Sequence, residues 1–137
     1  MIGNGKNKKS IAYVENLSAF IKHSLSFSKG LHIYNYVDKP DFSMNAFVKL
    51  IKKTLNIKNN ITIRIPFFFA LIVTFFIDIF SRIFNVKFPI SSIRVKKFCS
   101  DSLFNTKITN TGFKPPFDIE DALQKTIRYE LKKNNPK

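Results

Sequence analysis

A tyrosine followed four residues later by a lysine is the spacing in this chain that could support acid–base chemistry. Tyr129 and Lys133 have this spacing, and a nearby ammonium group helps a tyrosine hydroxyl to release its proton. Both residues fall at the exposed end of a helix expected at the C-terminus, so we interpret the match as coincidental. The sequence has no P-loop, no HExxH and no Gly-rich dinucleotide loop after a strand. The chain by itself therefore lacks the usual markers of a catalyst.

The chain carries a large excess of positive charge. Its 23 Lys and Arg against 9 Asp and Glu give a formal net charge of +14, so an electrostatic partner would be anionic. The cations are scattered, and the tightest groups are the pair Lys8-Lys9 and the segment 94–97. A single cysteine, Cys99, excludes an internal disulfide, and with only two histidines no metal site is expected. No signal peptide follows Met1, which predicts a cytoplasmic location.

Hydrophobic patterning predicts alternating strands and helices in a chain long enough for one domain. Strands are expected at Ser10–Val14, Leu31–Val37 and Ile61–Ile65. Helices with apolar residues at helical spacing are expected to begin at Asn16, Ser43 and Asp118, the first two acting as N-caps. The secondary structure of 93–98 is ambiguous, and one helical turn over 106–111 should end at Gly112. The basic segment 132–137 is expected to be a frayed tail.

The most apolar stretch, Ile65–Phe84, decides between a membrane protein and a globular one. A spanning helix needs about 20 mainly apolar residues, whereas the uncharged run here ends at Ile77. The polar residues of the stretch form one narrow stripe on a helix, and they are Thr74, Asp78, Ser81 and Asn85. Asp78 and Arg82 are four residues apart and could pair on one face. We therefore predict a mostly buried helix rather than a membrane span.

Several short segments in a fixed order carry a family resemblance. They are 3–17, 33–38, 43 onward, 94–98, 104–107, 111–115 and 121–129. Segment 3–17 has a glycine pair, a basic residue and then Ile-Ala-Tyr-Val-Glu-Asn, and segment 33–38 is a strand-like run containing Tyr-Asn and ending in Asp. In this order the segments resemble the C-terminal part of the extended short-chain dehydrogenases, the NAD-dependent epimerase/dehydratase family. The pattern is most similar to UDP-glucose 4-epimerase-like proteins.

The resemblance implies an α/β fold, namely the C-terminal part of a Rossmann-type short-chain dehydrogenase with its small substrate-binding lobe. In that family the Gly-rich dinucleotide loop, the catalytic Ser or Thr and the Tyr-x-x-x-Lys pair precede the point where this chain starts. Residues 1–137 would then be a single domain or fragment that is not catalytic by itself. The full-length enzymes use NAD to oxidise a sugar hydroxyl and reduce the ketone again with altered stereochemistry. We expect no cofactor to bind this chain alone.

The same resemblance assigns Arg94 and Lys9 to the diphosphate of a nucleotide sugar. The family usually has arginine at the position of Lys9, so the charge is kept but the bidentate geometry is lost. The acid often found three residues after the family's second arginine is replaced here by Lys97. A UDP-sugar, in polysaccharide biosynthesis, is therefore the expected partner.

Composition leaves two other functions open. The charge and the 16 Phe suit a small basic nucleic-acid-binding protein, although most Phe fall in helical stripes rather than on a strand platform. Residues 65–77 could instead anchor a membrane-associated protein, but the flanking cations show no side preference. We expect neither nucleic acid nor membrane as the partner. An unpaired edge at Leu31–Val37 could support self-association.

Overall fold

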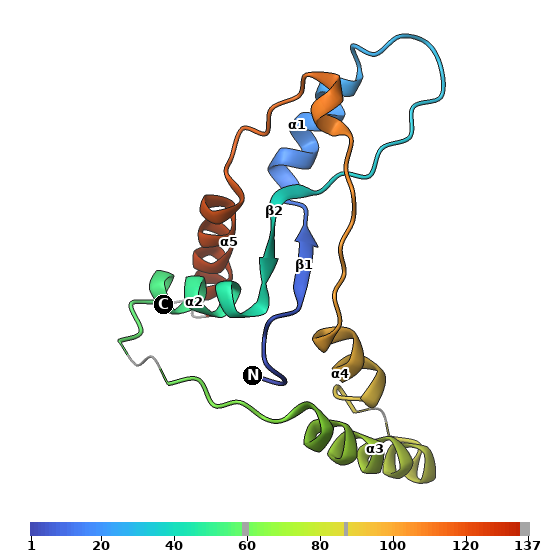
Figure 1. The fold of residues 1–137 in the computed structure, drawn as a ribbon, viewed down its shortest axis with the longest axis vertical. Coiled ribbons are helices and arrows are strands. Elements are labelled where there is room, and N and C mark those ends of the chain that lie inside the picture. Colours follow the sequence, from blue (N-terminus) through green and yellow to red (C-terminus); the bar gives the residue numbers. More distant parts are fainter. Residues whose placement is uncertain (59–60, 87, 135–137) are drawn as a thin grey trace.

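A two-stranded antiparallel sheet lies at the centre of the fold in the computed structural model, which describes residues 1–58, 61–86 and 88–134 (Figure 1). Strand β1 (Lys8–Ile11) pairs with β2 (Asp38–Ser43), with Lys8 opposite Ser43. The helices are α1 (Val14–Ser24), α2 (Met44–Thr54), α3 (Phe67–Phe84), α4 (Ser92–Cys99) and α5 (Ile119–Asn134). The described chain is thus mixed α/β, with α3 and α4 at the end of the molecule away from α1 (Figure 1).

Two of the predicted helix ends, at Ser43 and Gly112, are confirmed. The Ser43 hydroxyl accepts a hydrogen bond from the Ala46 N–H at 3.1 Å and starts α2. Gly112, with φ of +74°, ends a short 3-10 helix, η1 (Ile108–Thr111). Helix α4 settles the ambiguous segment 93–98. Helix α5 extends to Asn134, while 135–137 lie outside the described residues.

Two predicted strands are wrong. The segment Leu31–Val37 is extended but unpaired by strand hydrogen bonds, and Leu31 and Ile33 are 87% and 81% exposed. In Ile61–Ile65 only a single bridge from Ile65 to Ile2 forms. The strand partner of β1 is instead β2, the polar segment that follows Val37. The alternation of apolar and polar residues in Leu31–Val37 therefore did not identify the segment that pairs in the sheet. Self-association through this exposed, unpaired segment stays a prediction.

Asn16 is a buried hub rather than the predicted helix cap. Helix α1 starts two residues earlier, after Tyr13, and Asn16 is 0% exposed. Its amide nitrogen donates to the Asp38 carboxylate at 3.0 Å and to the Phe117 carbonyl at 2.9 Å. Its amide oxygen accepts from the Phe117 N–H at 3.0 Å. One side chain therefore joins α1, the start of β2 and the segment before α5.

Asp38 is the second buried member of this network. Its carboxylate also accepts hydrogen bonds from the Tyr13 N–H at 2.7 Å and from the Tyr36 hydroxyl at 2.9 Å. Burial, together with the hydrogen bond to Asp38 and its negative charge, raises the pKa of Tyr36 well above its ordinary value. A buried carboxylate with three donors is satisfied without a cationic partner.

Apolar packing is divided between two small cores. Leu50, Ile119 and Leu123 pack between α2 and α5. At the other end, Phe20 on α1 is 6% exposed and contacts a group of aromatic rings with centroids 5.3 to 6.3 Å away. These rings are Phe27, Tyr34, Tyr36 and Phe113. The second core holds the long 25–37 segment onto α1.

Helix α3 is exposed, so the prediction of a mostly buried helix is wrong. Only Ala70 and Thr74 are buried among its residues. The predicted polar stripe is the covered side, because Asp78 accepts a hydrogen bond from the Ser92 N–H of α4 at 3.0 Å. The helix is long and apolar enough to cross a membrane by length and composition. Periodicity identified residues that share a face, but it did not show which face would be covered.

Three carboxyl groups with lowered pKa values lead us to predict that the fold loses stability in acid. The pKa of Glu15 is lowered by its bond to Lys125, that of Asp41 by Lys39 and that of Asp78 by Ser92. A lowered folded-state pKa stabilises the fold above the ordinary values of 4.5 and 3.8, and this stability is lost as the pH falls through the folded values.

We therefore expect the urea midpoint to fall when the pH is lowered from about 5 to 3. Glu15→Gln should make this dependence shallower, because it removes one of the responsible carboxyls. Glu130→Gln, at an exposed position of α5, is the matched control and should leave the dependence unchanged. An identical profile for wild type and Glu15→Gln would contradict this assignment.

Candidate functional site

Helix α4 displays a group of cations at the surface. Arg94, Lys96 and Lys97 are exposed, whereas Val95 between them is buried. The Ser91 hydroxyl accepts from the Arg94 N–H, and Asp78 accepts from the Ser92 N–H, so both bonds hold the helix N-terminus. The N-terminus of α4 is thus held by two hydrogen bonds, while its cationic side chains face solvent.

Arg94 keeps most of its hydrogen-bonding capacity. One of its guanidinium nitrogens donates to the Pro89 carbonyl, at the turn before α4. A guanidinium has five N–H donors, and the side chain is exposed. The remaining donors can bind an anion such as a phosphate.

Lys9 has a structural role on β1. Its ammonium donates to the Lys97 carbonyl at 2.7 Å and to the Ser102 hydroxyl at 3.0 Å. These bonds fasten β1 to the end of α4 and leave one of three donors. Lys9 and Arg94 are therefore held at opposite ends of α4, and the structure does not bring them together through a common partner.

A pocket of about 300 Å³ lies between the N-terminal loop and α4. It is lined by Gly3, Asn4, Asn7, Phe67, Lys96, Cys99 and Ser100. Asn7 is held there because its amide donates to the Phe98 carbonyl at 2.7 Å. Burial raises the pKa of the Cys99 thiol, which disfavours a reactive thiolate. The pocket therefore offers neutral polar groups and one cation.

Lys96 also lines an apolar groove of about 440 Å³ between α3 and α4. The other lining residues are Leu71, Ile72, Phe75, Phe76 and Ser92. Lys96 therefore lines both the pocket beside the N-terminal loop and the apolar groove. Sequence reasoning missed this residue, and the only signal for it in the sequence was its membership of the basic cluster at 94–97.

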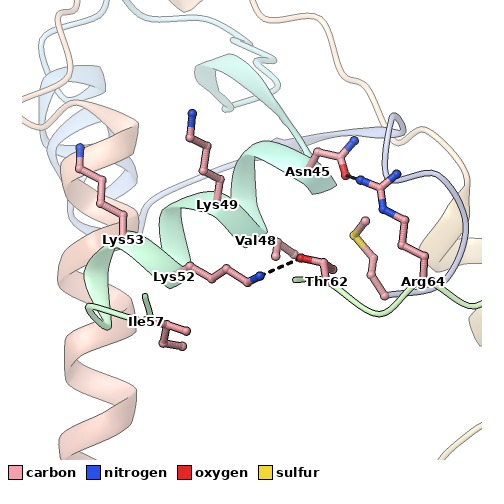
Figure 2. Close-up of a pocket in the computed structure, with 9 residues that line it drawn as sticks. Asn45, Val48, Lys49, Lys52, Lys53, Ile57, Thr62 and Arg64 are labelled. Atoms are coloured by element: carbon pink, nitrogen blue, oxygen red, sulfur yellow. Dashed lines mark hydrogen bonds between the residues drawn. The ribbon is translucent and has the colours of Figure 1, made fainter. Parts of the chain in front are cut away.

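A basic pocket of about 470 Å³ lies between α2 and the segment leading to α3 (Figure 2). The lining residues labelled there include the cations Lys49, Lys52, Lys53 and Arg64. Lys52 donates to the Thr62 hydroxyl at 2.8 Å, and Arg64 donates to the Asn45 side chain at 3.3 Å (Figure 2). Because Lys52 and Arg64 hold the chain in place, this pocket is the weaker candidate for an anion.

The described residues do not fit a dinucleotide cofactor or a metal. The connection from β1 to α1 is Ala12-Tyr13, without the glycines that let a diphosphate approach a helix N-terminus. In residues 1–58, 61–86 and 88–134, no three His, Cys, Asp or Glu side chains are grouped to hold a metal. The two strands carry Phe42 as their one aromatic residue, so the described sheet offers no stacking platform for nucleic acid.

Comparison with known proteins gives one informative similarity. No family model and no solved structure matches the chain. A curated protein from Escherichia coli O157:H7, N-acetyl-alpha-D-glucosaminyl-diphospho-ditrans,octacis-undecaprenol 4-epimerase, is 40% identical over 133 residues. The match covers 96% of this chain and 40% of that protein. The chain is therefore similar, over nearly its whole length, to a part of a sugar epimerase.

Proposed function

We propose that this chain is the substrate-binding part of an enzyme that epimerises a sugar carried on a diphosphate. The observation that carries the proposal is the 40% identity to a sugar epimerase across 96% of the chain. The order of the motifs in the sequence adds the finer assignment to the C-terminal part of a short-chain dehydrogenase. The chain spans 40% of that relative's length, so catalysis by the whole enzyme is part of the proposal.

Recognition of the diphosphate is assigned to the cations around α4. Arg94 has free guanidinium donors, which can form two parallel bonds to phosphate oxygens. Lys96 is exposed and lines the pocket beside the N-terminal loop. Lys9 keeps one donor while it positions the end of α4. This assignment keeps Arg94 and Lys9 as substrate residues and adds Lys96.

NAD is assigned to the parent enzyme rather than to this chain. The Ala12-Tyr13 connection does not fit a dinucleotide, and Tyr129 on α5 is exposed. The described residues thus offer substrate binding without a hydride acceptor. The chain alone is expected to bind the substrate and not to turn it over.

Two molecules could carry the sugar, and both attach it through a diphosphate. The sequence resemblance favours UDP, while the name of the relative specifies a diphospho-undecaprenol carrier. Both present a diphosphate next to the sugar, and the polyprenol adds an apolar tail. The apolar groove beside Lys96 supports the lipid carrier, because a polyprenyl chain can bury apolar surface against it.

Calorimetric titration tests the proposal with UDP-N-acetylglucosamine in one arm and farnesyl diphosphate N-acetylglucosamine in the other. Arg94→Ala should weaken binding roughly ten- to a hundred-fold, the equivalent of about 1.5 to 3 kcal/mol for a charge-assisted bond. Arg128→Ala, an exposed arginine on α5, is the matched control and should bind like wild type. Equal binding by Arg94→Ala and wild type would remove Arg94 from the site.

A further inference from the structure

We infer that the outward face of α3 docks on a lipid bilayer with anionic headgroups, with the helix lying in the plane of the membrane. All ten of its exposed large apolar residues lie on one side of the helix. They are Phe68, Phe69, Ile72, Val73, Phe75, Phe76, Ile79, Phe80, Ile83 and Phe84. At about 100° per residue this set covers roughly half of the helix circumference. Such a large apolar face requires a partner.

The side of α3 that packs against the rest of the fold is its polar side, so the apolar side is the one left exposed. Thr74 is buried, and Asp78 is bonded to the start of α4. A helix of a water-soluble core normally turns its polar stripe to solvent and its apolar residues inward. Here the arrangement is reversed, which is what an apolar environment around the helix would require.

The position of α3 makes the face accessible. Helix α4 is its packing partner among the described elements, and the pair lies at the far end of the molecule from α1 (Figure 1). The described residues 61–66 run without helix into α3, and the pair projects from the central sheet (Figure 1). A planar surface can therefore approach α3 without displacing the rest of the described fold.

Charge complementarity selects an anionic bilayer. Arg94, Lys96 and Lys97 are exposed on α4, the helix that packs against α3, and Lys96 lines a groove with Phe75 and Phe76 of the apolar face. The whole chain has a net charge of +14. Basic residues beside a membrane-facing helix attract acidic headgroups, and lysine stems can lie along apolar surface while the ammonium stays at headgroup depth. Lys96 at the edge of the apolar groove has this arrangement.

The same contacts exclude a spanning orientation. Asp78 lies near the middle of α3 and holds the N-terminus of α4. If α3 crossed the bilayer, this bond would place Arg94 and Lys96 inside the hydrocarbon, where charged side chains are strongly disfavoured. A helix with an apolar face and a covered polar side lies at the interface instead. This inference replaces the expectation that no membrane is involved.

Vesicle flotation of the full chain tests docking with phosphatidylcholine alone and with phosphatidylcholine mixed with phosphatidylglycerol. The wild type should float with the mixed vesicles. Phe68→Gln/Phe76→Gln, at positions 79% and 65% exposed, should reduce the partition coefficient by about a hundredfold or more. Leu31→Gln/Ile33→Gln, at 87% and 81% exposed, is the matched control and should float like wild type. Circular dichroism should show unchanged helix content in both variants.

The charge contribution is tested separately. Lys96→Gln/Lys97→Gln should reduce binding to the mixed vesicles by roughly tenfold and leave binding to phosphatidylcholine unchanged. Lys107→Gln/Lys114→Gln, at exposed positions away from α3 and α4, is the control. An equal loss in both lysine pairs would overturn the role of α4, because it would indicate attraction by net charge alone.

Nitroxide labels distinguish the orientation of the helix. Positions 69, 76 and 83 are seven residues apart and share one face, so in a Cys99→Ser background they should report similar membrane depths. Depths that change steadily from 69 to 83 would overturn the in-plane orientation.

Membrane docking itself would be overturned by a wild type that stays in the soluble fraction. It would also be overturned if the apolar face forms a dimer that Phe68→Gln/Phe76→Gln dissociates and no vesicle binding is seen. These vesicles contain no sugar, so the result does not depend on the proposed substrate.

Discussion

Asn16→Ala is expected to lower the free energy of unfolding by about 3 kcal/mol, because it removes three hydrogen bonds made by a side chain that is 0% exposed. The substitution removes both bonds to the Phe117 backbone and one donor to the Asp38 carboxylate. Each such hydrogen bond contributes about 0.5 to 1.5 kcal/mol, and more where one partner is charged, as at Asp38. A small domain has only about 5 to 15 kcal/mol of total stability, so a large share would be lost.

Urea denaturation followed by circular dichroism measures this effect. Asn110→Ala is the matched control, because Asn110 is exposed on η1 and should change stability by no more than about 0.5 kcal/mol. Equal stability of the two variants would show that Asn16 is not the hub of the fold. The variant is also expected to expose residues 113–118 to proteolysis first, since Asn16 holds Phe117.

Phe20→Ala is expected to cost about 3 to 5 kcal/mol, the range for removing a buried phenylalanine from a core. Phe20 is the ring that contacts Phe27, Tyr34 and Phe113 together. Loss of the ring leaves a cavity and also releases the 25–37 segment, which has no strand pairing to hold it. Thermal denaturation should show the loss, and limited proteolysis should show faster cleavage within 25–37.

Phe104→Ala provides the comparison for this substitution. Phe104 is 55% exposed, so its removal should change stability far less than the removal of Phe20. If both variants lose the same stability, packing around Phe20 does not hold the 25–37 segment. If Phe20→Ala is destabilised but cleavage within 25–37 is unchanged, the segment is held by other contacts.

The order of the motifs along the sequence is enough to predict an epimerase-like chain. The similarity to a sugar epimerase over 96% of the chain supports that interpretation at the level of the reaction class. The substrate residues Arg94 and Lys9 stay predictions, because their contacts neither establish nor exclude a diphosphate. Lys96 required the structure, since its distinguishing feature is its place between two pockets formed by distant segments.

Local features of the fold were determined by the sequence alone. The cap at Ser43, the end of η1 at Gly112 and the helical run of α3 depend on hydrogen bonds within a few residues. Such bonds are encoded by neighbouring side chains and by the φ angle that glycine permits. The net charge is likewise a property of composition.

Only the tertiary structure decided the role of Asn16, the place of β2 and the covered side of α3. Asn16 and Phe117 are 101 residues apart in the chain, so no local pattern reports their contact. A helical period shows that Thr74 and Asp78 share a face, but the docking of α4 decides that this face is the covered one. Long-range contacts select among locally equivalent faces, and for that reason the burial of α3 could not be derived from its sequence.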